Sequence, residues 1–67
     1  MDELRSLEQI EFDNPGFGLS RRYDREGVEY AIFYRDAAGR SCHVHCRDKN
    51  QIQSIIDRLR TARDRQS

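Results

Sequence analysis

The chain has 67 residues and a mass of 8.0 kDa, with 36% hydrophobic and 36% charged residues. Twelve lysine and arginine residues balance twelve aspartate and glutamate residues, so the formal net charge is zero. This balance excludes a strongly basic nucleic-acid arm, an acidic tail and a highly charged disordered chain. No apolar run approaches the ~20 residues of a membrane span, and Met1-Asp2-Glu3 is too acidic to begin a signal peptide. We therefore expect one cytoplasmic domain over residues 1–67.

Charge is distributed unevenly along the chain. The first 20 residues hold one arginine and five acidic residues, whereas residues 21–67 hold eleven basic and seven acidic ones. The simplest interpretation is a solvated surface on each part. The alternative is that the acidic N-terminal segment, residues 1–16, folds over a basic surface or binds a basic partner.

Residues 2–12 fit two structures. Leu4, Leu7 and Ile10 recur every three residues, as in a short helix. Ile10 and Phe12 lie on either side of Glu11, which is the alternation of an edge strand. We expect a short helix over residues 2–8 and then an extended stretch through Phe12, which would add a fourth strand to a sheet.

Three turn sequences that begin with aspartate and end with glycine punctuate the next part of the chain. They occupy residues 13–16, 24–27 and 36–39. Aspartate favours the first turn position, and glycine accepts the positive φ that closes the turn. The segments between and after these turns, 17–23, 28–35 and 40–47, are rich in aromatic and β-branched residues or alternate as strands do. The spacing predicts an antiparallel three-stranded meander over residues 17–47.

Residues 48–65 change to helical periodicity. Apolar residues from Ile52 to Ala62 recur at the i, i+3, i+4 and i+7 positions of one helix face. Asp48 and Gln51 resemble a capping box, and arginines are concentrated in the second half, where the helix dipole favours cations. We therefore expect an amphipathic C-terminal helix packed on one face of the meander, which makes this an α+β protein.

Loop length predicts the register of the sheet, because a one-residue slip inverts every side chain of a strand. A three-residue loop at 37–39 with glycine in the bulge position pairs Ile32 with Val44, and a four-residue loop at 24–27 pairs Leu19 with Ile32. Apolar side chains then gather on the face that the helix covers. The predicted core face comprises Phe17, Leu19, Tyr23, Val28, Tyr30, Ile32, Tyr34, Cys42, Val44 and Cys46.

The opposite face of the sheet places polar and charged residues around one aromatic residue, Phe33. We predict that this face is the binding surface, and the alternative is a solvated face with one tolerated aromatic. The candidate binding residues are Arg22, Phe33, Arg35, His43, His45 and Arg47.

Residues 42–46 hold every cysteine and histidine of the chain. Zinc needs about four converging ligands, whereas strand alternation sends both cysteines to one face and both histidines to the other. His43 and His45 could hold a metal only with a third ligand or a second chain, so we predict no metal site and no cofactor. A Cys42–Cys46 disulfide would have to span roughly 13 Å, so we expect two buried thiols.

An acid–base pair of His43 and His45 beside Arg22 and Arg47 would be similar to a ribonuclease site. No sequence signature accompanies these residues, and the predicted face has no pocket that would position a substrate. The glycines at 16 and 18 lead into a strand rather than a helix, which excludes a glycine-rich phosphate loop. We predict a protein without catalytic activity.

Residues 30–40, followed by a strand and an amphipathic helix, resemble the arm-type, AP2-like DNA-binding domains of phage and mobile-element integrases. The resemblance covers residues 17–62 in topology. It implies that the sheet enters the major groove and that Arg22, Arg35 and Arg47 contact DNA. In size and charge balance the chain is also similar to phage-encoded inhibitors, including anti-CRISPR proteins.

We therefore predict a small protein-binding module, a regulator or inhibitor of a protein partner. It would act through the exposed sheet face and the acidic N-terminal segment. Net charge decides between the two functions, because a domain that neutralises several phosphates should be clearly basic. The alternative is an AP2-like nucleic-acid-binding domain that uses the same sheet face.

Overall fold

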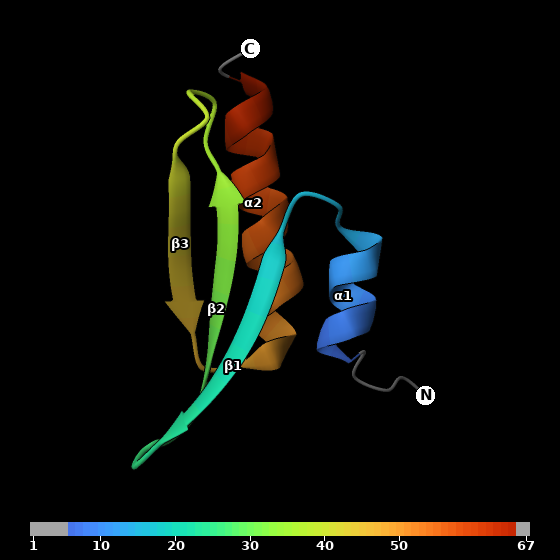
Figure 1. Ribbon diagram of the computed structural model, residues 1–67. Helices are drawn as coiled ribbons and strands as arrows, with labels where there is room; N and C mark the ends of the chain where they lie inside the picture. The colour runs from blue at the N-terminus through green and yellow to red at the C-terminus, as the bar shows by residue number, and fades with distance from the viewer. Residues whose placement is uncertain (1–5, 66–67) are drawn as a thin grey trace.

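The computed structural model describes residues 6–65, which form a sheet and two helices. The sheet is an antiparallel meander in the order β1-β2-β3, and α2 covers one of its faces while α1 lies beside β1 (Figure 1). The predicted α+β class, with a three-stranded meander and a C-terminal helix, is confirmed. The elements are α1 (Leu7–Asp13), β1 (Gly18–Asp24), β2 (Gly27–Arg35), β3 (Ser41–Cys46), the 3₁₀ turn η1 (Lys49–Gln51) and α2 (Ile52–Arg65).

Helix α1 begins later in the chain than expected. The extended stretch predicted through Phe12 is wrong, because this residue lies in α1, and the described part of the chain has no fourth strand. Ser6 caps the helix by accepting a backbone N–H of the first turn at 3.1 Å. Ile10 faces the core while Phe12 is 80% exposed, so the apparent strand alternation was the two sides of a helix. The predicted helical residues 2–5 lie outside the described residues.

The predicted register is confirmed in both hairpins. Leu19 lies opposite Ile32 in the first hairpin, and Ile32 lies opposite Val44 in the second. The second loop has the three expected residues and ends in a glycine with a φ of 84°, which suits the left-handed closing position. In the first hairpin Asp24 pairs with Gly27, so the loop has two residues instead of four. This shorter loop leaves the register unchanged.

The core lies between α2 and the sheet. Ile32 in the central strand and Ile52 and Ile56 in α2 are completely buried. Ile10 of α1 and Phe17 extend this cluster towards the N-terminus. Partly buried apolar side chains surround it, among them Leu19, Val28, Tyr34, Val44, Cys46, Ile55 and Leu59. Helix and sheet are therefore joined chiefly by aliphatic contacts.

The tip of the first hairpin departs from the predicted core. Tyr23 was expected on the covered face but is 71% exposed, because the hairpin extends beyond the first turn of α2 (Figure 1). The side chain of Arg21 contacts it instead, with the guanidinium carbon 5.9 Å from the centre of the Tyr23 ring. Strand alternation predicts the face of Tyr23 correctly, but no described helix or strand covers that face at the hairpin tip.

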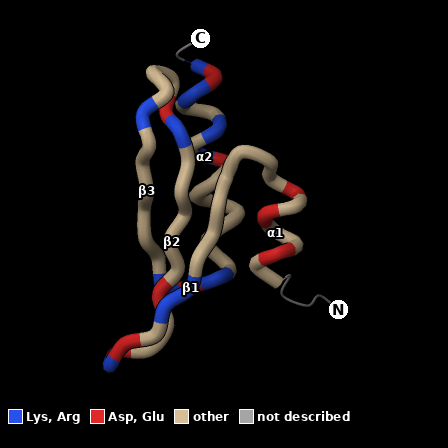
Figure 2. The backbone as a smooth tube through the Cα atoms, in the orientation of Figure 1, with Lys and Arg blue, Asp and Glu red and all other residues tan. Residues whose placement is uncertain are grey.

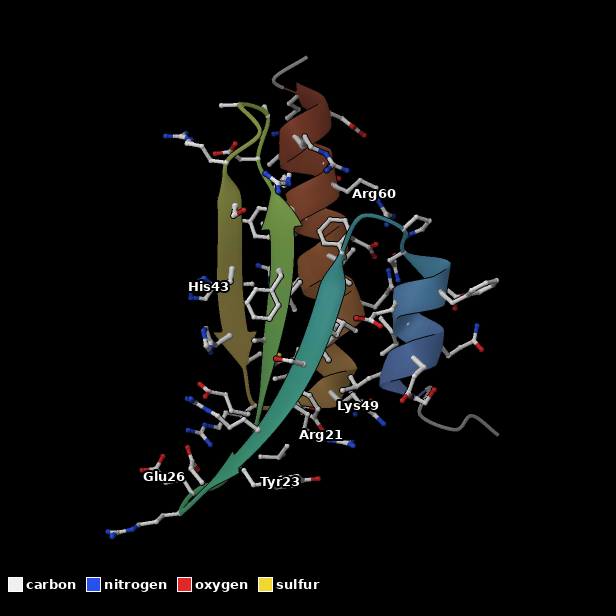
Figure 3. The ribbon with its side chains drawn as sticks, in the orientation of Figure 1. Arg21, Tyr23, Glu26, His43, Lys49 and Arg60 are labelled. Carbon is white, nitrogen blue, oxygen red and sulfur yellow. The ribbon has the colours of Figure 1, made fainter. Side chains whose placement is uncertain are left out.

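One buried polar side chain joins α1 to α2. Asn14 is 2% exposed, and its amide nitrogen donates to the carbonyl of Ile10 at 2.8 Å and to Oε1 of Gln53 at 2.9 Å. Its amide oxygen accepts from Nε2 of Gln53 at 3.0 Å and from the guanidinium of Arg60 at 2.7 Å. In Figure 3 Arg60 extends from α2 towards the turn between α1 and β1. The whole amide is thus hydrogen-bonded, as burial requires.

Helix α1 also protects the outer edge of β1. The backbone N–H of Leu19 points away from β2 and donates to the carboxylate of Glu11 at 2.6 Å. An exposed strand edge would otherwise present this group to other chains. The position of α1 therefore covers the first part of one edge of the sheet.

Replacing Ile56 with alanine should lower the free energy of unfolding by about 2–5 kcal/mol, because it opens a cavity at a completely buried position. Thr61→Ala is the matched control in the same helix, since Thr61 is exposed and its loss should change stability by less than about 0.5 kcal/mol. Urea unfolding followed by circular dichroism measures both. Equal stability of the two variants would contradict the packing of α2 on the sheet.

Replacing Asn14 with alanine should lower the free energy of unfolding by about 1–3 kcal/mol, because the partly buried side chains of Gln53 and Arg60 and the carbonyl of Ile10 lose a hydrogen-bond partner. A double-mutant cycle with Gln53→Ala should give a coupling free energy of about 0.5–3 kcal/mol, as for residues in direct contact. Strictly additive effects in urea unfolding would show that this pair does not join the two helices.

Candidate binding face of the sheet

The face of the sheet opposite α2 is uncovered in the described structure, and we call it the open face. Helix α1 does not lie over it, because it packs beside β1 and against α2 (Figure 1). Strand alternation places all six predicted binding residues at or beside this face. Its members are Ser20, Arg22, Glu29, Ala31, Phe33, Arg35, His43, His45 and Arg47.

A line of polar contacts crosses the three strands at Glu29. A guanidinium nitrogen of Arg22 on β1 lies 2.8 Å from one carboxylate oxygen, and Nδ1 of His45 on β3 lies 3.2 Å from the other. The hydrogen bond from Arg22 lowers the pKa of Glu29, against the opposing effect of burial. Glu29 is not among the predicted binding residues, although the predicted register places it opposite Arg22. It is the shared acceptor of the open face.

The other two arginines lie at opposite ends of the sheet. Arg47 lies 3.4 Å from carboxylate oxygens of Asp24 and of Glu26 at the tip of the first hairpin, and its hydrogen bond lowers the pKa of Asp24. Arg35 instead donates to the carbonyl of Gly39 at 2.8 Å. Figure 2 shows basic and acidic residues interleaved at the hairpin tip. The structure therefore does not bring the three predicted arginines into one basic cluster.

A row of rings runs along the open face from β2 to β3. The ring centres of Phe33 and His43 lie 5.8 Å apart, and those of His43 and His45 lie 5.0 Å apart. Phe33 is 46% exposed. It stands between two shallow hollows, one of about 140 Å³ on the side of Glu29 and one of about 270 Å³ on the side of Ser41. The half-exposed aromatic ring thus lies between two hollows of this face.

The cysteines and histidines separate as alternation predicts. Among residues 6–65, no three His, Cys, Asp or Glu side chains converge closely enough for one chain to hold a metal ion. Both cysteines are free and half-buried, which is less burial than predicted. Burial still raises the pKa of the Cys46 thiol.

A second concave region lies on the helix side and was not predicted. A cavity of about 180 Å³ is lined by Phe17, Tyr34, Leu59 and Arg63, among others. The guanidinium carbon of Arg63 lies 5.7 Å from the centre of the Phe17 ring, which covers part of the apolar surface. Helical periodicity indicated only that Leu59 faces the sheet, and carried no signal for this arginine.

No family model matches the chain, and no curated protein or solved structure matches it either. The resemblance to AP2-like integrase domains therefore stays a prediction. Within the described ranges, neither helix has the length and apolar character that crossing a bilayer requires.

Acid should destabilise the protein through three carboxylates whose pKa values are lowered in the folded state: Asp24, Glu29 and Asp36. Such groups contribute stability that is fully present well above their unfolded pKa values and is lost as the pH falls through the folded ones. The free energy of unfolding should therefore begin to fall as the pH approaches 4.5, the ordinary value for glutamate, and continue to fall below 3.8, that of aspartate.

Urea unfolding at a series of pH values between neutral and 3 measures this dependence. Glu29→Gln should flatten the curve below pH 4.5, the ordinary glutamate value, because it removes one of the three carboxylates whose pKa is lowered. Thr61→Ala, at an exposed position that does not titrate, is the control and should leave the shape of the curve unchanged. An identical pH dependence in the Glu29 variant would contradict the assigned ion pair.

Proposed function

We propose that this protein is a non-enzymatic binding module that recognises a protein partner through the open face and acts as a regulator or inhibitor of it. One observation carries the proposal. A half-exposed aromatic, Phe33, stands at the centre of a sheet face whose arginines already have partners within the molecule.

The surroundings of Phe33 suit an interface anchor. Aromatic residues ringed by polar groups contribute a large share of the binding energy at protein interfaces. The two hollows beside the ring offer recesses for partner side chains, and the imidazoles of His43 and His45 supply polar contacts at the rim. Because Phe33 lies in the central strand, its position is held by hydrogen bonding on both sides.

The same geometry argues against a phosphate-binding face. Arg22 would have to leave Glu29, and Arg47 would have to leave Asp24, before either could neutralise a phosphate. The released carboxylates would then lie against a polyanion, which costs affinity. This supports protein binding over the AP2-like alternative.

The acidic N-terminal segment contributes a separate surface. Helix α1 packs against β1 and α2, so its described part does not fold over the arginines of the open face. A partner that contacts both α1 and the open face would have to wrap around the edge of β1. We therefore assign the principal contact to Phe33 and a secondary, charge-dependent one to the exposed carboxylates of α1, Glu8 and Asp13.

The experiment compares two aromatic variants of the tagged protein. Phe33→Ala should weaken binding to the captured partner by tenfold or more, since hot-spot truncations typically cost about 2 kcal/mol or more. Phe12→Ala is the matched control, because Phe12 is even more exposed but lies on α1. Circular dichroism verifies that both variants fold. Equal loss in both variants, or in neither, would contradict the assigned anchor.

A gel-shift titration at two salt concentrations tests the alternative. The intact chain should bind duplex DNA no tighter than roughly the 10⁻⁴–10⁻⁶ M range of non-specific binders at physiological salt. Tight binding that falls steeply with salt and is lost in Arg22→Ala would overturn the proposal in favour of nucleic acid.

A further inference from the structure

The two edges of the sheet differ in protection. The first part of the edge of β1 is covered by α1, whose Glu11 accepts the outward N–H of Leu19. At the edge of β3, no described segment lies alongside the strand (Figure 1). Its residues, Ser41–Cys46, include no lysine or proline, and they pair with β2 without a bulge. Lysines, prolines and bulges are the features that usually prevent an edge strand from pairing with another chain, and β3 lacks all three.

The register identifies which backbone groups face outward. The backbone N–H of Asp36 donates to the carbonyl of Arg40, and an antiparallel ladder alternates from such a pair. Cys42, Val44 and Cys46 therefore direct their backbone groups towards β2. His43 and His45 direct theirs to the open edge, and their side chains project from the open face.

The strand sequence is self-complementary. Residues 42–46 read Cys-His-Val-His-Cys in either direction. Antiparallel pairing of two copies about Val44 would place His43 opposite His45 of the second copy. The outward N–H and C=O groups of one copy would then hydrogen-bond to those of the other, which continues the ladder across both sheets.

We propose that β3 pairs with β3 of a second copy about a twofold axis at Val44, and that His43 and His45 of the two copies bind a divalent transition-metal ion, Zn²⁺. One chain offers two imidazoles, which are too few, whereas two chains place four on the same side of one continuous sheet. Four nitrogen ligands satisfy the tetrahedral preference of zinc.

The contacts of His45 prepare it as a ligand. Its Nδ1 lies 3.2 Å from Glu29, which is itself held by Arg22 at 2.8 Å. A carboxylate on one imidazole nitrogen orients the ring and leaves Nε2 for the metal, as in carboxylate–histidine–zinc arrangements. In Figure 3 His43 lies beside the outer edge of β3, where the second copy would pair. The inference concerns the strand edge and does not rest on the proposed function.

The first experiment measures solution mass. The reduced protein should shift from 8.0 kDa to twice that mass on addition of zinc chloride, with half an equivalent of zinc bound per chain. His43→Ala and His45→Ala should each abolish the shift. Phe12→Ala, on α1 and away from both histidines, should retain it. Because the measurement contains no partner protein, its outcome is independent of the proposed partner binding. A monomer at saturating zinc, or a zinc-dependent dimer in both histidine variants, would overturn the proposal.

The second experiment tests the register with the cysteines. Cys42 would face Cys46 of the second copy in a non-hydrogen-bonded pair, whose Cα separation of about 4.5 Å lies within the disulfide range. Diamide takes up the two electrons and two protons as the sulfur–sulfur bond forms. With zinc present, mixed Cys42→Ser and Cys46→Ser proteins should give a covalent heterodimer, and each variant alone should not. Cross-linking of equal yield in either variant alone would exclude this register.

Discussion

The buried amide of Asn14 is the contact on which the placement of α1 against the rest of the fold depends. Helix α1 has seven residues, too few to be stable without tertiary contacts. Asn14 fixes its C-terminal end to Gln53 and Arg60 of α2, residues that lie 39 and 46 positions further along the chain. With α1 held there, Ile10 enters the core and the chain turns directly into β1. A single polar side chain thus fixes the end of α1 to α2.

That position determines which parts of the sheet remain available. Because α1 and α2 lie on the same side, the core uses one face of the sheet and the other stays open. Because Glu11 reaches the backbone of Leu19, the first part of the edge of β1 is covered, whereas no described segment lies along the edge of β3. The surfaces to which we assign binding are therefore the ones that the folding contacts do not use.

The sheet could be predicted from the sequence because its signals are local. Turn glycines and strand alternation lie within a few residues of what they specify, so the pairings of Ile32 with Leu19 and Val44 were correct. The start of α1 was missed although Ser6, followed three residues later by Gln9, is a local N-cap signal. The packing of α1 could not be predicted, because it depends on the long-range contacts of Asn14. Tyr23 was misassigned because alternation selects a face but says nothing about how far the covering helix extends.

The same distinction applies to the open face. The strand register determines which residues lie on this face. It does not determine which acidic residue each arginine pairs with. Arg47 joins Asp24 and Glu26 because the two-residue loop brings the hairpin tip close to the end of β3. Sequence alone could not show that the arginines would be separated in this way.

The ion pairs change what the open face presents to a partner. With Arg22 held at Glu29 and Arg47 at the hairpin tip, the cations are locally compensated, and the groups left prominent are one phenyl and two imidazole rings. A surface of this kind favours apolar contact and metal coordination over attraction to phosphate. In the proposed twofold pair, both copies of α2 lie on one side of a six-stranded sheet and both copies of Phe33 on the other. A partner with two matching sites would then gain affinity through effective concentration, without requiring a stronger contact at either ring.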